Sequence, residues 1–87
     1  MTRIIKRSDR FTETAIDDEI VVMRLDNGEF FALAESAAAI WRLIDGERDR
    51  AAILPELEEF YGNDGRLSED VDEFLAKLRE ADLIEER

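Results

Sequence analysis

A turn signal between two apolar segments constrains the fold of this chain more than any other feature. Residues 19–25 are rich in β-branched side chains, residues 29–33 are again apolar, and Asn27-Gly28 lies in the polar stretch between them. Asn-Gly favours a two-residue type I′ turn, in which both central residues take positive φ. We therefore predict an antiparallel hairpin with a register that places Leu25 opposite Phe30.

This hairpin has apolar residues on both faces. Adjacent strand residues point to opposite sides of a sheet, so Phe30 and Phe31 cannot both face one core. A two-stranded hairpin is not stable alone, so one face must pack on the rest of the chain. Residues 10–16 are expected to add a first strand, which ends at a turn formed by Asp17-Asp18. The outer face is then covered by that strand and the N-terminal residues, covered by a partner, or left partly exposed.

Three helices are expected after residue 34, because apolar residues there recur at helical spacing. Glu35 or Ser36 is the candidate cap of the first helix, which ends near residue 45. Asp49 and Ser68 are the candidate caps of the second and third, which end near residues 61 and 81. Pro55 should kink the second helix or delay its start, because proline lacks a backbone N–H. The residues expected to face the core are Ala37, Ile40, Trp41, Ile44, Ile53, Leu57, Phe60, Tyr61, Val71, Phe74, Leu75 and Leu78, with Leu83 and Ile84 folding back onto it.

The distribution of charge excludes some classes of partner. The chain has 87 residues, which suits one domain, and a formal net charge of −11, which repels the phosphates of a nucleic acid. Residues 1–9 are basic and are interpreted as a solvated arm, with contact to a partner as the alternative, and residues 10–87 as the single domain. No apolar run is long enough to span a membrane. The absence of cysteine is compatible with a reducing cytoplasm, where we expect the protein to act.

Catalytic and metal-binding groups are not expected. The chain has no histidine and no cysteine, so the common nucleophile–base pairs cannot form. Its glycines are scattered and form no phosphate-binding loop. Its carboxylates fall on the polar faces of the expected helices, and residues 26–29 lack the ligand spacing of a calcium loop, which extends over about twelve residues. We therefore predict a binding protein that is not an enzyme and that uses no cofactor and no metal.

The order of these segments resembles the PqqD family, whose members recognise peptides in pathways that modify ribosomally synthesised peptides. The resemblance covers about residues 10–85, and one departure is Ala34, where the family often has asparagine at the entrance to the first helix. It implies an α+β, winged helix-turn-helix-like fold, in which a three-stranded antiparallel sheet is followed by three α-helices. The resemblance rests on AIDDEIVV at residues 15–22, LDNGEFFAL at 25–33, AAAIW at 37–41, IDG at 44–46, the end of the second helix at 57–62 and the last helix before Leu83-Ile84.

The resemblance also implies a binding mode. Family members bind the leader segment of a precursor peptide as an extra strand beside the third strand, in a groove that has the third helix as its other wall. The implied partners are this leader peptide and the modifying enzymes of the pathway, either a leader peptidase and cyclase of the lasso-peptide type or a radical-SAM enzyme. The residues that this places at the peptide-binding site are Glu29, Phe30, Phe31, Ala32, Leu33, Asp70, Val71, Glu73, Phe74, Leu75, Lys77 and Leu78.

Two other functions fit parts of the sequence. A winged-helix DNA-binding regulator has a similar arrangement of helices, but the third helix carries Asp70, Asp72 and Glu73, which would repel phosphates. An adaptor subunit could bind a folded protein through the same apolar surface. Leader binding is preferred because the PqqD resemblance implies it, and a hairpin with two apolar faces is compatible with the addition of a strand.

Overall fold

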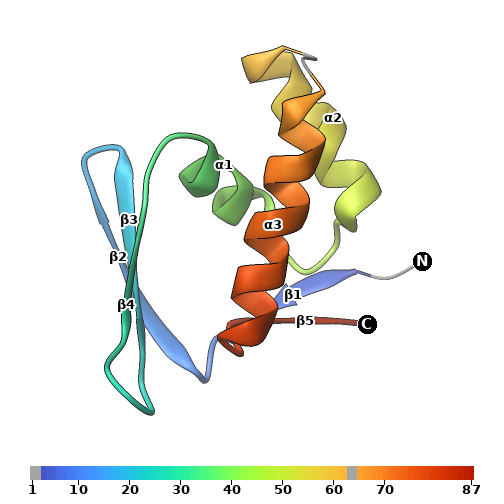
Figure 1. The fold of residues 1–87 in the computed structure, drawn as a ribbon. Helices are drawn as coiled ribbons and strands as arrows, with labels where there is room; N and C mark the ends of the chain where they lie inside the picture. Colours follow the sequence, from blue (N-terminus) through green and yellow to red (C-terminus); the bar gives the residue numbers. More distant parts are fainter. Residues whose placement is uncertain (1–2, 63–64) are drawn as a thin grey trace.

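The strands predicted from the hairpin pattern form one antiparallel sheet. The computed structural model describes residues 3–62 and 65–87, and in it β2 (Phe11–Ile16), β3 (Glu19–Arg24) and β4 (Phe30–Leu33) lie in the order β2-β3-β4. The sheet forms one side of the molecule, and the three helices form the opposite side (Figure 1). The predicted α+β class, with a three-stranded sheet followed by three helices, is confirmed.

The predicted register of the hairpin is wrong by two residues. Phe30 lies opposite Met23, not opposite Leu25. The connection is a longer loop rather than a two-residue type I′ turn, because Gly28 has a positive φ of 71° and Asn27 does not. Instead, the Asn27 side-chain oxygen accepts a hydrogen bond of 2.9 Å from the backbone N–H of Glu29. A shift of two residues preserves the faces of the strands, so the opposite orientation predicted for Phe30 and its neighbour is retained.

The helices are α1 (Ser36–Leu43), α2 (Arg50–Tyr61) and α3 (Arg66–Glu80). The predicted cap of α2 is confirmed, because the Asp49 carboxylate accepts a hydrogen bond from the backbone N–H of Ala52. α2 begins directly after this cap, so Pro55 does not delay its start. Glu35, one of the two predicted candidates, is the N-cap residue of α1, but its side chain makes no cap hydrogen bond. The predicted cap of α3 is wrong, because α3 begins after Gly65 and Ser68 lies inside the helix.

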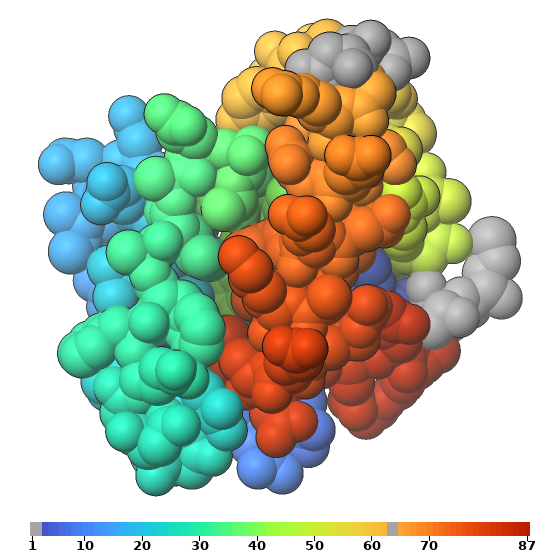
Figure 2. All heavy atoms as spheres, in the orientation of Figure 1, coloured from blue at the N-terminus to red at the C-terminus, as the bar shows by residue number. Residues whose placement is uncertain are grey.

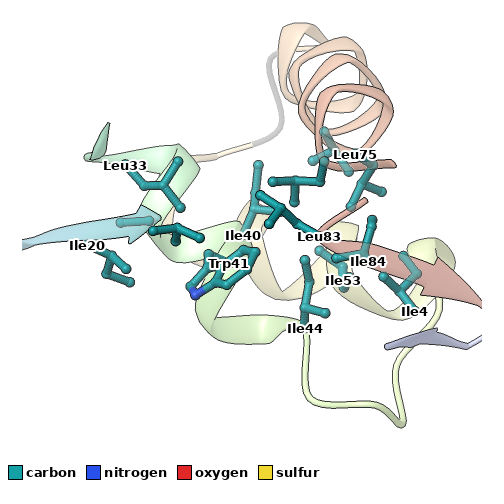
Figure 3. Close-up of a cluster of buried hydrophobic side chains, with 14 of the residues drawn as sticks. Ile4, Ile20, Leu33, Ile40, Trp41, Ile44, Ile53, Leu75, Leu83 and Ile84 are labelled. Atoms are coloured by element: carbon teal, nitrogen blue, oxygen red, sulfur yellow. The ribbon is translucent and has the colours of Figure 1, made fainter. Parts of the chain in front are cut away.

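The core lies between the inner face of the sheet and the three helices (Figure 3). Trp41 is completely buried, as predicted for a core residue, and Leu83 and Ile84 fold back onto this cluster as expected. Two predicted core residues lie outside this cluster. Phe60 and Tyr61, in the last turn of α2, are 80% and 48% exposed, and both line a hollow between α2 and α1.

The basic N-terminal stretch is not a solvated arm. β1 (Ile4–Lys6) pairs with β5 (Ile84–Glu86) in a separate antiparallel two-stranded sheet, and the two strands lie side by side in Figure 1. Ile4 is 1% exposed, and the backbone N–H of Arg7 donates a 2.8 Å hydrogen bond to the carbonyl oxygen of Leu83. β1 has only three residues, so no alternation of apolar and polar residues predicts it, and the neighbouring basic residues suggest a solvated segment instead.

This docking predicts a measurable contribution of Ile4 to stability. Ile4→Ala should lower the free energy of unfolding by about 2–5 kcal/mol, because it removes a fully buried aliphatic side chain. Ile16→Ala is the matched control, since Ile16 is exposed and its truncation should change stability by less than about 0.5 kcal/mol. Urea unfolding followed by circular dichroism measures both. Equal stabilities of the two variants would contradict the docking of β1.

Among residues 3–62 and 65–87, no helix is both long and apolar enough to cross a membrane.

Candidate functional site

β4 is one of the two edge strands of the three-stranded sheet, and it is the one that lies beside α3. One side of β4 bonds to β3, where the backbone N–H of Arg24 donates a 2.9 Å hydrogen bond to the carbonyl oxygen of Glu29. Bonded and non-bonded pairs alternate along an antiparallel ladder, so Phe31 and Leu33 carry the remaining bonds to β3. The N–H and C=O groups of Phe30 and Ala32 therefore point outward, where they are available to another strand.

α3 lies beside this edge and beside the start of α1, and two hollows lie along this side of α3. One, of about 250 Å³, lies between the hairpin and the C-terminal half of α3. The other, of about 120 Å³, lies between the start of α1 and the middle of α3, and Lys77 lines both. We call these two hollows the groove. In the space-filling view the groove follows the boundary between the green surface of β4 and α1 and the orange-red surface of α3 (Figure 2). Its lining residues are Arg24, Glu29, Phe31, Ser36, Ala37, Ile40, Asp70, Glu73, Phe74, Lys77, Glu80 and Ala81.

The predicted site residues divide into three sets in the structure. Asp70, Glu73, Phe74 and Lys77 of α3 line the groove, together with Glu29 and Phe31 of the hairpin. Phe30 and Ala32 lie at the edge with their side chains on the outer face of the sheet. The remaining four are core residues that hold the walls in place and are too buried to contact a ligand: Leu33, Val71, Leu75 and Leu78.

Several residues of the groove are not among those predicted from the sequence. Glu80 and Ala81 continue the helical spacing from Lys77, so the pattern of α3 alone is sufficient to find them. Ser36, Ala37 and Ile40 come from α1, and nothing in the spacing of residues shows that the start of α1 faces the middle of α3. Their place depends on how the helices pack.

The rim of the groove is predominantly acidic. Glu29, Asp70, Glu73 and Glu80 contribute carboxylates, against the bases Arg24 and Lys77. Arg24 is already paired, since its guanidinium donates to the Asp26 carboxylate at 2.7 Å, and this hydrogen bond lowers the pKa of Asp26. Lys77 makes no ion pair within the described part of the chain. The groove thus combines a negative field with one cation that is free to bind a carboxylate or a carbonyl oxygen.

The chemistry that this site supports is the binding of an extended chain. Outward N–H and C=O groups at Phe30 and Ala32 offer backbone hydrogen bonds, and Phe31 and Phe74 offer apolar contact beside them. Within residues 3–62 and 65–87, no three acidic side chains converge in a way that would hold a metal ion.

Comparison with known proteins identifies the family. The model of the family described as coenzyme PQQ synthesis protein D (PqqD) matches residues 19–84, which include both walls of the groove. The chain belongs to the PqqD family. The PqqD resemblance seen in the sequence is thereby confirmed, although the start of α1 after Ala34 lacks the side-chain cap expected of Glu35 or Ser36.

Individual relatives are consistent with this assignment. The chain is 47% identical over 53 residues to a PqqA binding protein of Pseudomonas fluorescens, a match that covers 61% of this chain and 58% of the relative. It is 51% identical over 43 residues to a PqqA binding protein of Klebsiella pneumoniae, over 49% of this chain and 47% of the relative. The chain thus spans about half the length of the curated relatives that it matches. These PqqD-family relatives carry the name of binding proteins, in agreement with a non-catalytic domain.

One solved structure has the same fold over nearly its whole length. It is TbiB1 in complex with the TbiA(beta) leader peptide, with a TM-score of 0.81 and 29% sequence identity. The match covers 93% of this chain and 95% of the TbiB1 chain. The whole architecture described above, and not only the segment that the PqqD model matches, is therefore shared with a protein whose structure contains a leader peptide.

Proposed function

We propose that this protein binds the leader segment of a ribosomally synthesised precursor peptide as an added strand on β4. The observation that carries the proposal is the free edge at Phe30 and Ala32, which lies along a groove walled by α3. An added strand satisfies outward backbone groups whatever its sequence, and the adjoining hollows receive alternate side chains.

The dimensions of the groove suit a short extended segment. Its wall on α3 runs from Asp70 to Ala81, which at 1.5 Å per residue is about 17 Å. An extended chain advances about 3.3 Å per residue, so about five residues match this length. Only alternate residues of such a strand point toward α3. The groove therefore contacts two or three side chains of the leader.

The relatives support the same class of ligand. The curated members are PqqA binding proteins, and TbiB1 is seen with a leader peptide. By this proposal the protein presents the bound peptide to modifying enzymes in the cytoplasm. These are a leader peptidase and cyclase of a lasso-peptide pathway, or a radical-SAM enzyme like that of PQQ synthesis.

DNA binding is disfavoured by the surface of α3. Glu69, Asp70 and Glu73 lie on this helix with their side chains at least partly exposed, and Asp72 pairs with Arg50 across to α2. A recognition helix with this charge would meet a phosphate backbone with net repulsion. Leader binding requires no such contact, and an acidic groove favours a peptide that carries basic residues.

A titration followed by NMR tests the proposal. We expect the backbone amide signals of β4 and the exposed face of α3 to shift when a leader peptide is added to the ¹⁵N-labelled protein. The probe is the leader of a precursor encoded beside this protein's gene, and the TbiA(beta) leader peptide is a second probe. The amide signals of Phe30 and Ala32 should shift most, because their N–H groups gain hydrogen bonds.

Two outcomes would contradict the proposal. Shifts restricted to β1 and the residues before Phe11 would place the ligand away from the groove. No shift with either leader, alongside binding to a DNA duplex, would favour the regulator instead. A scrambled leader of the same composition is the control, since it has the same charge but should lose the side-chain fit.

A further inference from the structure

Another hollow, which is not part of the groove, lies between α1 and the C-terminal end of α2. It has a volume of about 280 Å³ and is lined by Ala39, Arg42, Leu43, Leu57, Phe60 and Tyr61. We call it the apolar pocket, because all of these side chains except that of Arg42 are apolar or aromatic. Phe60 is 80% exposed, which is the highest exposure among the large apolar residues of the described chain. Exposed apolar surface gathered around a hollow marks a binding site more often than scattered exposure does.

A further hollow links the apolar pocket to the groove through shared lining residues. It has a volume of about 230 Å³ and lies at the start of α1 and the start of α3. It shares Ser36 and Asp70 with the groove and Tyr61 with the apolar pocket. A chain that follows β4 past Leu33 therefore meets this connecting hollow next, and then the apolar pocket behind Tyr61.

We propose that the apolar pocket binds a large aliphatic or aromatic side chain of the same leader peptide, from the segment that leaves β4 at the Leu33 end. This inference rests on the proposed function. Backbone bonding at an edge strand is nearly independent of sequence, so selectivity must come from side-chain pockets. The apolar pocket offers the largest apolar contact along this path, and Phe60 offers a ring face for stacking or edge contact.

A second copy of the protein is the other occupant to consider, and the charge disfavours it. Each chain has a formal net charge of −11, so two copies repel one another. The groove rim is acidic in the same way, whereas a leader peptide with basic residues is attracted to it. Charge thus disfavours a second copy, and the shared lining residues Ser36, Asp70 and Tyr61 favour the peptide that β4 is proposed to bind.

Fluorine NMR separates the groove from the apolar pocket. The chain has five phenylalanines, and incorporation of 4-fluorophenylalanine places a reporter at each. Phe31 and Phe74 report on the groove, Phe60 on the apolar pocket, and the buried Phe11 is an internal control. With the full leader peptide, the groove signals and the Phe60 signal should shift together while the Phe11 signal stays in place. Shortening the leader from one end, and from that end alone, should remove the Phe60 shift and keep the groove shifts.

Each result decides between the two proposals. Shifts at Phe31 and Phe74 without any shift at Phe60 would overturn the inference and leave leader binding intact. If none of the signals of Phe31, Phe74 and Phe60 shifted, both leader binding at the groove and the occupation of the apolar pocket would be contradicted. As a check on affinity, Phe60→Ala should weaken the full leader about tenfold and leave the shortened leader unaffected. Ile16→Ala, which truncates an exposed side chain that lines neither hollow, should change neither affinity. A dimer in sedimentation that Phe60→Ala converts to monomer would assign the pocket to a second copy and overturn the inference.

Discussion

Ala32→Pro should abolish leader binding while the protein stays folded. Proline at residue 32 removes the N–H group that points to the free edge, and its ring occupies the space where the carbonyl oxygen of an added strand would lie. We expect affinity to fall at least tenfold, or about 1.4 kcal/mol, in isothermal calorimetry. The fold should tolerate the change, because proline is compatible with an edge strand when its N–H is not part of the ladder.

Two companion variants make this result specific. Ala32→Val keeps the outward N–H and favours extended structure, so it should bind the leader like the wild type. Phe31→Pro removes a donor to β3 and a side chain that packs on the core, and should lower stability far more than Ala32→Pro does. A folded Ala32→Pro protein with unchanged affinity would contradict strand addition at β4. A Phe31→Pro protein as stable as Ala32→Pro would show that the outward N–H groups have been assigned to the wrong residues.

The parts of the site that the sequence predicts are those with a local pattern. Helical spacing places Asp70, Glu73, Phe74 and Lys77 along one side of α3, and the PqqD resemblance identifies that helix as a wall of the groove. The hairpin follows from its turn residues, but its register does not. An Asn-Gly pair is compatible with several loops, and the side-chain bond of Asn27 to the Glu29 N–H selects the wider one.

The parts that the sequence does not predict depend on packing between distant segments. β1 and β5 are three residues each, too short for an alternating pattern, and they are stabilised by each other. Phe60 and Tyr61 are predicted to be buried, which would require neighbouring helices to cover the apolar stripe of α2 up to its last turn. How α1 and α3 pack against the end of α2 decides whether these side chains are covered, and the apolar pocket lies between α1 and this end of α2.

Trp41→Ala should remove a large part of the stability of the protein. Trp41 is fully buried, its ring lies 5.2 Å from that of Phe11 in an edge arrangement, and the Lys6 ammonium lies 4.5 Å from its centroid. Truncating a buried tryptophan costs about 3–5 kcal/mol. A domain of this length is stable by roughly 4–13 kcal/mol in total, so urea unfolding should show either a much lower midpoint or no folded baseline. Circular dichroism is the measurement, since Trp41 is the chain's single tryptophan and its fluorescence is lost with it.

The polar contacts of Trp41 connect three separate segments of the fold. Its Nε1–H donates a 2.9 Å hydrogen bond to the Glu13 carboxylate of β2, and Lys6 of β1 covers the ring. Burial lowers the pKa of Lys6, and the carboxylates of Glu13 and Asp45 oppose that shift. The cost of holding this ammonium in the fold is therefore fully present below the lowered pKa, and it disappears as the pH rises from the lowered pKa through the ordinary value of 10.5.

A double-mutant cycle separates the hydrogen bond from the packing. Glu13→Ala should cost about 1–3 kcal/mol, because it leaves the buried Nε1–H of Trp41 without an acceptor. Trp41→Phe keeps an aromatic ring and removes that donor, so Glu13→Ala should cost little in its background. A coupling energy near zero would show that Glu13 does not anchor the ring. A coupling of the expected size would show that this hydrogen bond ties β2 to α1. Since α1 supplies Ser36, Ala37 and Ile40 to the groove, the same bond would then hold the sheet and the α1 side of the binding site in one fixed arrangement.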